Sequence, residues 1–132
     1  MLITIETIPH NLQRLSGSIG GDWRFVTTAG IEHLTIRISD LHNWRMNFLF
    51  ALHELVEAMM CKHSHITTEM VDEDEVNASS FDDPDSFSGY PNSCFQKEHN
   101  DALAIEWIVS RLLNVDWKEY GERVNALVQQ PR

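Results

Sequence analysis

Apolar and polar residues alternate in the first forty positions of the chain. Leu34, Ile36 and Ile38 occupy every second position of one segment, which is typical of a strand with one buried face. Residues 2–8 and 22–28 are rich in β-branched and aromatic side chains, and glycines between the segments supply turns. The pattern predicts a small, mostly antiparallel sheet that is covered on one face.

Helical spacing replaces this alternation after Asp40, which we expect to be the N-cap of a long helix that ends near Lys62. Three further helices are expected, ending near residues 76, 114 and 129. Their predicted N-terminal caps are Thr67, Ser93 with Gln96, and Asp116 with Glu119.

The segment 77–92 has the composition of a loop, rich in Asp, Ser and Pro. Long loops in small domains are often functional, so this acidic segment is a candidate lid. The chain of 132 residues is long enough for one domain, with a β-rich part at 1–40 and a helical part at 41–130. We therefore predict a single α+β domain.

The charge balance narrows the range of partners. Asp and Glu number 20 against 10 Lys and Arg, for a net charge of −10. Such a chain is repelled by phosphate backbones and by anionic lipids, so we expect neither nucleic-acid nor membrane binding. Two cysteines make no disulfide framework, and the first residues lack the pattern of a signal peptide. A cytoplasmic protein, in a bacterial or phage-infected cell, is expected.

The long central helix carries three ionisable residues among apolar ones. His53 and Glu57 are four residues apart and project from one face, and Glu54 lies beside them. An imidazole and a carboxylate at this spacing can bind one divalent ion. The apolar residues on both sides of the motif indicate a buried helix, where charged groups are costly unless they are paired or metal-bound. A metal site and a structural polar cluster are the two interpretations.

A later helix shows the same feature. His99 and Glu106 interrupt an apolar stripe that also contains Ala102, Val109 and Leu113. The small Ala102 leaves room for an ion or a substrate. We expect His99 to be the third ligand, unless it is an ordinary core histidine, and Glu106 to be a fourth ligand or the partner that orients a histidine. Three protein ligands leave one position for water, which points to hydrolysis.

Two other groups are weaker candidates. Cys61, His63, His65 and Cys94 could form a zinc knot, although the spacing of the first three does not suit one helical face. The acidic run at 72–75 and the acids at 82–85 lack the glycine and the alternation of a calcium loop, and we expect them on a solvated surface.

The segment Leu-His-Glu-Leu-Val-Glu-Ala at 52–58, preceded by the strand at 34–39, resembles the zincin-like metallopeptidase arrangement, here in HExxE form. The resemblance implies that His53 and Glu57 are metal ligands, that Glu54 is the general base, and that a downstream helix delivers the third ligand. Its substrate would be a peptide or another small molecule. Zinc is the first expectation for the ion. Glu57 replaces the usual second histidine with a harder oxygen ligand, which makes manganese, iron or magnesium further possibilities.

The chain also resembles a group of small uncharacterised bacterial and phage proteins, which implies a shared fold and site. The segments that carry this resemblance are 13–14, 21–23, 36–40, 52–58, 98–99, residue 106 and 115–117.

Two alternative functions stay open. Glu54-x-x-Glu57 and Glu98-x-x-Asp101 are similar to the magnesium-binding pattern of all-α nucleotide pyrophosphohydrolases of the MazG type. Such an enzyme would use magnesium to assist the attack of water on nucleotide phosphates. The third possibility is a non-enzymatic phage accessory protein in which a buried ion only stabilises the fold. An open, water-bearing coordination position would count against that possibility.

Overall fold

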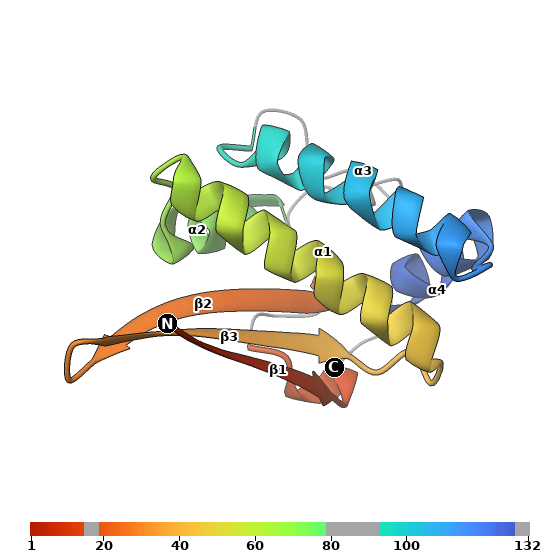
Figure 1. The fold of residues 1–132 in the computed structure, drawn as a ribbon, viewed down its shortest axis with the longest axis horizontal. Helices are drawn as coiled ribbons and strands as arrows, with labels where there is room; N and C mark the ends of the chain where they lie inside the picture. Colours follow the sequence, from red (N-terminus) through yellow and green to blue (C-terminus); the bar gives the residue numbers. More distant parts are fainter. Residues whose placement is uncertain (15–18, 79–92, 129–132) are drawn as a thin grey trace.

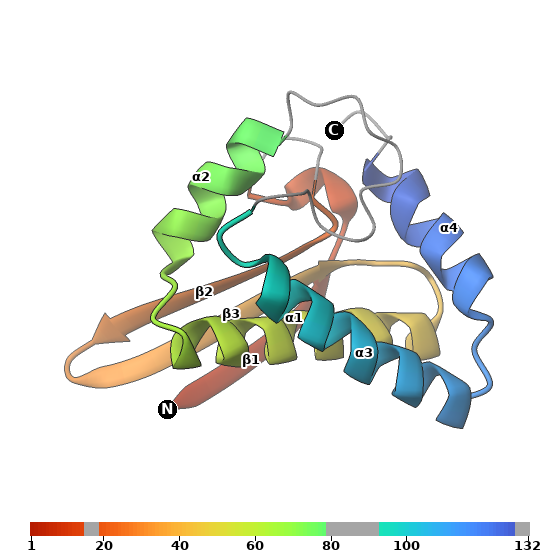
Figure 2. The same cartoon turned by 90° about the horizontal axis from the view of Figure 1, so that it is seen from above.

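The computed structural model describes residues 1–14, 19–78 and 93–128, which form the expected α+β fold in two layers (Figure 1). One layer is a sheet of β1 (Leu2–Ile8), β2 (Gly21–Thr28) and β3 (Ile31–Ser39), with a short 3-10 helix, η1 (His10–Leu12), after β1. The other layer consists of helices. α1 (Trp44–His63) lies over the sheet and α3 (Gln96–Leu112) runs beside α1, while α2 (Thr68–Ala78) and α4 (Trp117–Val128) stand at opposite ends (Figure 2).

The strand order of the sheet is β1–β3–β2. The sheet is mixed, because β3 pairs in parallel with β1 and antiparallel with β2. β2 and β3 form an antiparallel hairpin whose turn places Ala29 and Gly30 at φ +52° and +78°. Positive φ at both turn residues matches the twist of the paired strands. β1 pairs with β3 in parallel, so the antiparallel prediction is wrong for this pairing. The connection from β1 to β2 is long enough to carry the chain to the opposite edge of the sheet, which allows β1 and β3 to run the same way.

The core lies between β3 and α1. Leu34, Ile36 and Ile38 are at most 1% exposed, and Leu49 of α1 is fully buried against the same core. Burying each of these side chains contributes about 1.5–3 kcal/mol. α1 packs on β2 and β3 on one side and on α3 on another. Its apolar residues therefore extend around most of its circumference, as the sequence indicates.

α1 begins three residues later than predicted. Asn43, and not Asp40, is the N-cap, and its Oδ1 accepts two backbone amides of the first turn at 3.0 and 3.2 Å. Asp40 Oδ1 instead accepts the His42 amide at 2.8 Å and the Asn47 side-chain amide at 3.0 Å. A turn with His42 at φ +57° separates the end of β3 from the helix, and Asp40 stabilises that turn.

Two of the three other predicted caps are confirmed. Thr67 Oγ1 accepts a backbone amide of the first turn of α2 at 3.2 Å, and Asp116 Oδ1 does the same for α4 at 2.8 Å. The predicted capping box of Ser93 and Gln96 is wrong, because Phe95 occupies the N-cap of α3 and no side chain caps that helix.

Most of the candidate lid, residues 79–92, lies outside the described residues, and its first two positions belong to the end of α2. Within the described part of the chain, no helix has the length and apolar character needed to cross a bilayer.

Candidate metal centre

Three potential ligand atoms meet between α1 and α3. α1 presents His53 and Glu57 one turn apart, and α3 presents His99 to the same point. His53 Nε2 lies 3.1 Å from Glu57 Oε2 and 3.2 Å from His99 Nδ1, and the latter two atoms are 2.8 Å apart. Among the described residues, no other group of three His, Cys, Asp or Glu side chains is spaced to hold an ion. The structure thus brings the three predicted ligands together.

The spacing and chemistry of these atoms suit a small divalent ion. In a tetrahedral zinc site with bonds of about 2.0–2.2 Å, two ligand atoms lie about 3.3 Å apart. The observed separations of 2.8–3.2 Å need to widen by about 0.1–0.5 Å to reach that geometry. Two imidazoles and one carboxylate form a donor set that zinc, manganese and iron accept, whereas magnesium prefers oxygen ligands alone. The residues therefore fit a transition-metal ion.

The electrostatics keep the ligand carboxylate charged. Burial raises the pKa of Glu57, but hydrogen bonds from His53 and His99 outweigh burial and hold the pKa of Glu57 well below its usual range. Burial likewise lowers the pKa of His53, but hydrogen bonds to Glu106 and Glu57 outweigh burial and hold it well above its ordinary value. Without an ion the cluster is therefore a buried ion pair. Glu57 is an anion in that state, as a metal ligand must be.

Glu106 holds His53 from the side opposite to the cluster. Its Oε1 lies 3.3 Å from His53 Nδ1, and its Oε2 accepts the Tyr120 hydroxyl of α4 at 2.5 Å. When Nδ1–H donates to Glu106, Nε2 of the ring is directed at the cluster. Carboxylates that accept the second ring nitrogen in this way orient histidine ligands in metal sites. Of its two predicted roles, the position of Glu106 matches that of an orienting partner.

Trp23 fixes the other ligand side chain. Its indole N–H, which lies on β2, donates to Glu57 Oε1 at 3.0 Å, and Glu57 Oε2 faces the two histidines. The sequence pattern predicts only a strand at Trp23 and indicates no role for Tyr120, so neither supporting residue was predicted. The signal available was that a buried Trp or Tyr needs a polar partner. That signal does not say which residue the partner is.

Glu54 lies next to the cluster and faces β2. A Cβ added to Gly21 would come within 2.4 Å of Glu54 Oε1, so glycine is what allows the carboxyl group to lie against this strand. Glu54 is 7% exposed. Burial, and then the negative charge of Glu57, raise the pKa of Glu54 well above its ordinary value. Glu54 is therefore a buried titratable group beside the three ligand atoms and outside their cluster.

A further charge network supports the same side of β2. The Arg14 guanidinium binds both carboxylate oxygens of Asp22 on β2, at 2.8 and 2.9 Å, and both of Asp72 on α2, at 2.8 and 2.9 Å. Bidentate pairs of this kind are geometrically specific. Asp72 opens the acidic run that was expected on a solvated surface, and that expectation is wrong for this residue. The arrangement links α2 to the strand that carries Trp23.

The candidate zinc knot does not form among the described residues. Cys61 is buried within the core, whereas Cys94 is exposed, and His63 and His65 are exposed at the end of α1. Burial raises the pKa of the Cys61 thiol and raises that of Cys94 to about 12, so both stay protonated at neutral pH. Metal binding requires the thiolate, which this environment disfavours.

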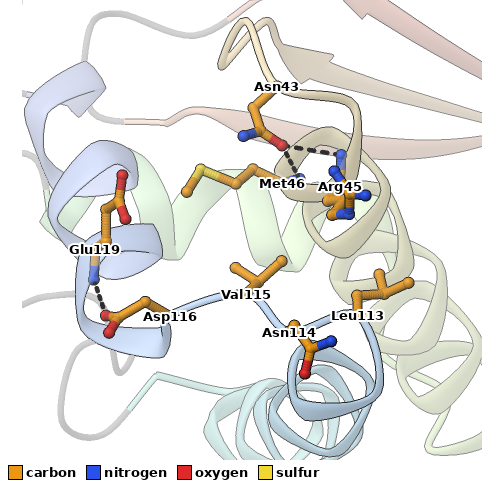
Figure 3. A pocket seen from close by; sticks show the side chains of 8 residues that line it. All are labelled: Asn43, Arg45, Met46, Leu113, Asn114, Val115, Asp116 and Glu119. Atoms are coloured by element: carbon orange, nitrogen blue, oxygen red, sulfur yellow. Dashed lines mark hydrogen bonds between the residues drawn. The ribbon is translucent and has the colours of Figure 1, made fainter.

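A surface hollow lies apart from the cluster (Figure 3). The start of α1 and the connection between α3 and α4 line it, and none of the three cluster residues does. Its polar side chains Asn43 and Asp116 accept backbone amides as the caps of α1 and α4. The hollow is therefore a gap between helix ends, and it contains no assembled set of ligands.

No protein-family model, curated protein or solved structure matches the chain. The resemblance to zincin-like metallopeptidases and to the small phage and bacterial proteins therefore rests on the sequence segments alone.

Proposed function

We propose that this protein binds one divalent metal ion, with zinc as the best fit, through His53 Nε2, Glu57 Oε2 and His99 Nδ1. The observation that supports this most is the convergence of three largely buried ligand atoms from two helices to within 2.8–3.2 Å of one another. Such a cluster is costly to bury without compensation. Two hydrogen bonds that orient the ligands also support the proposal: Glu106 accepts from His53 Nδ1, and Trp23 donates to Glu57.

We further propose that the site is that of a zincin-like hydrolase acting on a peptide or another small molecule. Three protein ligands leave a coordination position at which bound zinc would activate water. Glu54 would serve as the general base that accepts a proton from this water and passes it to the leaving group. A bound cation would lower the pKa of a neighbouring carboxyl group and would so favour the ionised form of Glu54 that this role needs. The free thiols Cys61 and Cys94 fit a cytoplasmic location.

The two alternative functions, a nucleotide pyrophosphohydrolase and an accessory protein with a structural ion, each require a different arrangement of these residues. A magnesium-dependent nucleotide pyrophosphohydrolase needs its acids in one cluster, whereas Asp101 pairs with Lys97 at the surface at 2.9 Å. A purely structural ion needs a shell filled by protein atoms. Glu106 would have to supply the missing ligand by turning away from Tyr120.

The metal content of the purified protein tests the proposal that it binds a divalent ion. The purified wild-type protein, equilibrated with zinc and dialysed, is expected to hold about one zinc ion per chain by elemental analysis. His53→Ala and His99→Ala should each lose it. His63→Ala is the matched control, because His63 is an exposed histidine of the same helix outside the cluster. A wild-type protein without stoichiometric metal would refute the proposal, as would equal loss in the control.

The variant Glu54→Gln tests the proposal that the site is hydrolytic. This variant should retain zinc and lose at least about a hundredfold in hydrolysis rate on a panel of peptides and esters, because it lacks the general base. Cobalt substitution reports the open position, since its visible spectrum should change when a small competing ligand is added. A cobalt spectrum insensitive to ligands would favour the accessory protein. Magnesium-dependent release of pyrophosphate from nucleoside triphosphates would favour the MazG-type enzyme.

A further inference from the structure

The edge strand β1 has an apolar side that the helices leave uncovered. Ile3 and Ile5 pair in register with Leu34 and Ile36 of β3, so they lie on the helix-facing side of the sheet. Leu34 and Ile36 are fully buried, yet Ile3 and Ile5 are 48% and 49% exposed. α1 packs on β2 and β3, and the start of β1 lies beyond the helical layer when the molecule is seen from above (Figure 2). The hydrophobic core beneath the helices therefore does not extend to the edge strand β1.

No described strand pairs with the backbone groups on the outer edge of β1. In the part of the chain that the structure describes, β1 is a terminal strand of the sheet and pairs only with β3. Native proteins usually protect such an edge with charged residues, prolines or bulges, because it is a template for another strand. β1 has seven consecutive paired positions and neither a proline nor a lysine. An extended segment is the partner that satisfies both the backbone and the apolar side chains.

The low charge of β1 makes a second copy of β1 the segment that fits this edge. Two molecules that each carry a net charge of −10 repel one another over most of their surfaces. β1, by contrast, has a single charged side chain, Glu6, and Arg37 of β3 neutralises it at 3.1 Å. An antiparallel, twofold pairing centred on Thr4 or Ile5 keeps the two copies of Glu6 from lying opposite each other. Centred on Thr4, the pairing places Ile3 of each copy opposite Ile5 of the other, and centred on Ile5 it places the two Ile5 side chains opposite each other.

We propose that two copies of this chain associate through β1, antiparallel, to form one continuous sheet of six strands in the order β2–β3–β1–β1–β3–β2. This pairing is isologous and closes as a dimer. It does not depend on the metal site. A strand of seven residues is about 23 Å long, so this contact is smaller than the roughly 800 Å² per partner of a standard stable interface. The dimer should therefore be weak, with a Kd of about 1–100 µM.

Sedimentation velocity over about 1–300 µM protein, with any tag at the C-terminus, tests the proposal. The wild-type protein should shift from monomer to dimer across this range. Ile5→Lys should raise the Kd at least about tenfold, because it places two like charges together at the centre of the pairing. Hydrogen exchange should show the amides of β1 becoming protected as the concentration rises. Circular dichroism at low concentration should show that Ile5→Lys keeps the wild-type fold.

Two variants that introduce the same charge elsewhere are the controls. Val26→Lys changes a β-branched residue on the other edge strand that has the same 49% exposure, and Ile108→Lys changes an apolar residue of α3 that is 53% exposed. Both should leave the dimer intact. A wild-type protein that is monomeric at every concentration would overturn the proposal. So would a dimer that Ile108→Lys or Val26→Lys disrupts and Ile5→Lys does not, because its interface lies elsewhere.

Discussion

Replacing Tyr120 by Phe removes one oxygen atom from a chain of contacts that connects α4 to the candidate metal centre. Tyr120 is 1% exposed and Glu106 is 2% exposed, and the hydroxyl donates to Glu106 Oε2 at 2.5 Å. Burial and the neighbouring Glu106 raise the pKa of Tyr120 well above its ordinary value, so the hydroxyl remains a donor at neutral pH. Phenylalanine fits the same space and leaves one oxygen of Glu106 without this donor.

The expected loss follows from that geometry. A hydrogen bond to a charged group contributes about 1.5–3 kcal/mol, and leaving a buried acceptor unsatisfied costs a similar amount. We therefore expect Tyr120→Phe to lower the free energy of unfolding of the metal-free protein by about 2 kcal/mol. For a chain of 132 residues this corresponds to a fall in Tm of about 7 °C. Zinc affinity should fall about tenfold, because Glu106 no longer holds His53 in one orientation.

Urea unfolding and zinc competition measure the two effects. Ser110→Ala is the control, because it deletes another fully buried hydroxyl, which donates to the neutral carbonyl of Trp107 at 2.6 Å. It should cost about 1 kcal/mol and leave zinc affinity unchanged. A stability loss below about 0.5 kcal/mol in Tyr120→Phe would refute the assigned strength of the contact. Equal zinc affinity in wild type and Tyr120→Phe would refute the orienting role of Glu106.

Three further variants test neighbouring features. Gly21→Ala should destabilise the protein by about 1–3 kcal/mol in urea unfolding, since the new Cβ would lie 2.2 Å from Phe50 Cε1; unchanged stability would mean that β2 and α1 separate easily. Asn43→Ala should cost about 1 kcal/mol in the same assay through loss of the N-cap of α1, and no loss would contradict that cap. Trp23→Phe should weaken zinc binding about tenfold in competition assays by releasing Glu57 Oε1; unchanged affinity would contradict its orienting role.

The site depends on both layers of the fold. β2 supplies the donor to Glu57, α1 and α3 supply the ligand atoms, and α4 supplies the donor to Glu106. Disturbing any of these elements should therefore affect metal binding as well as stability. Arg14 extends the same dependence to α2, which it ties to β2 through Asp72 and Asp22.

Several features follow from local sequence alone. The alternation around Leu34 and Ile36 identifies β3, because strand residues two apart always face the same side. The juxtaposition of His53 and Glu57 is equally local, because residues four apart on a helix are neighbours whatever surrounds the helix. The α+β class and the extent of α1 could therefore be predicted within a few residues.

The remaining features depend on contacts between residues far apart in the chain. His99 reaches the cluster because α3 packs beside α1, and no spacing rule predicts a partner 42 residues away from Glu57. The parallel pairing of β1 and the contacts of Trp23 and Tyr120 were decided in the same way. The periodicity of apolar residues indicates which face of a helix or strand is buried, whereas the packing of the elements decides which residues that face contacts. The sequence by itself therefore determined one turn of helix that carries two candidate ligands, and only the tertiary structure brought the third candidate ligand and the orienting side chains to that turn.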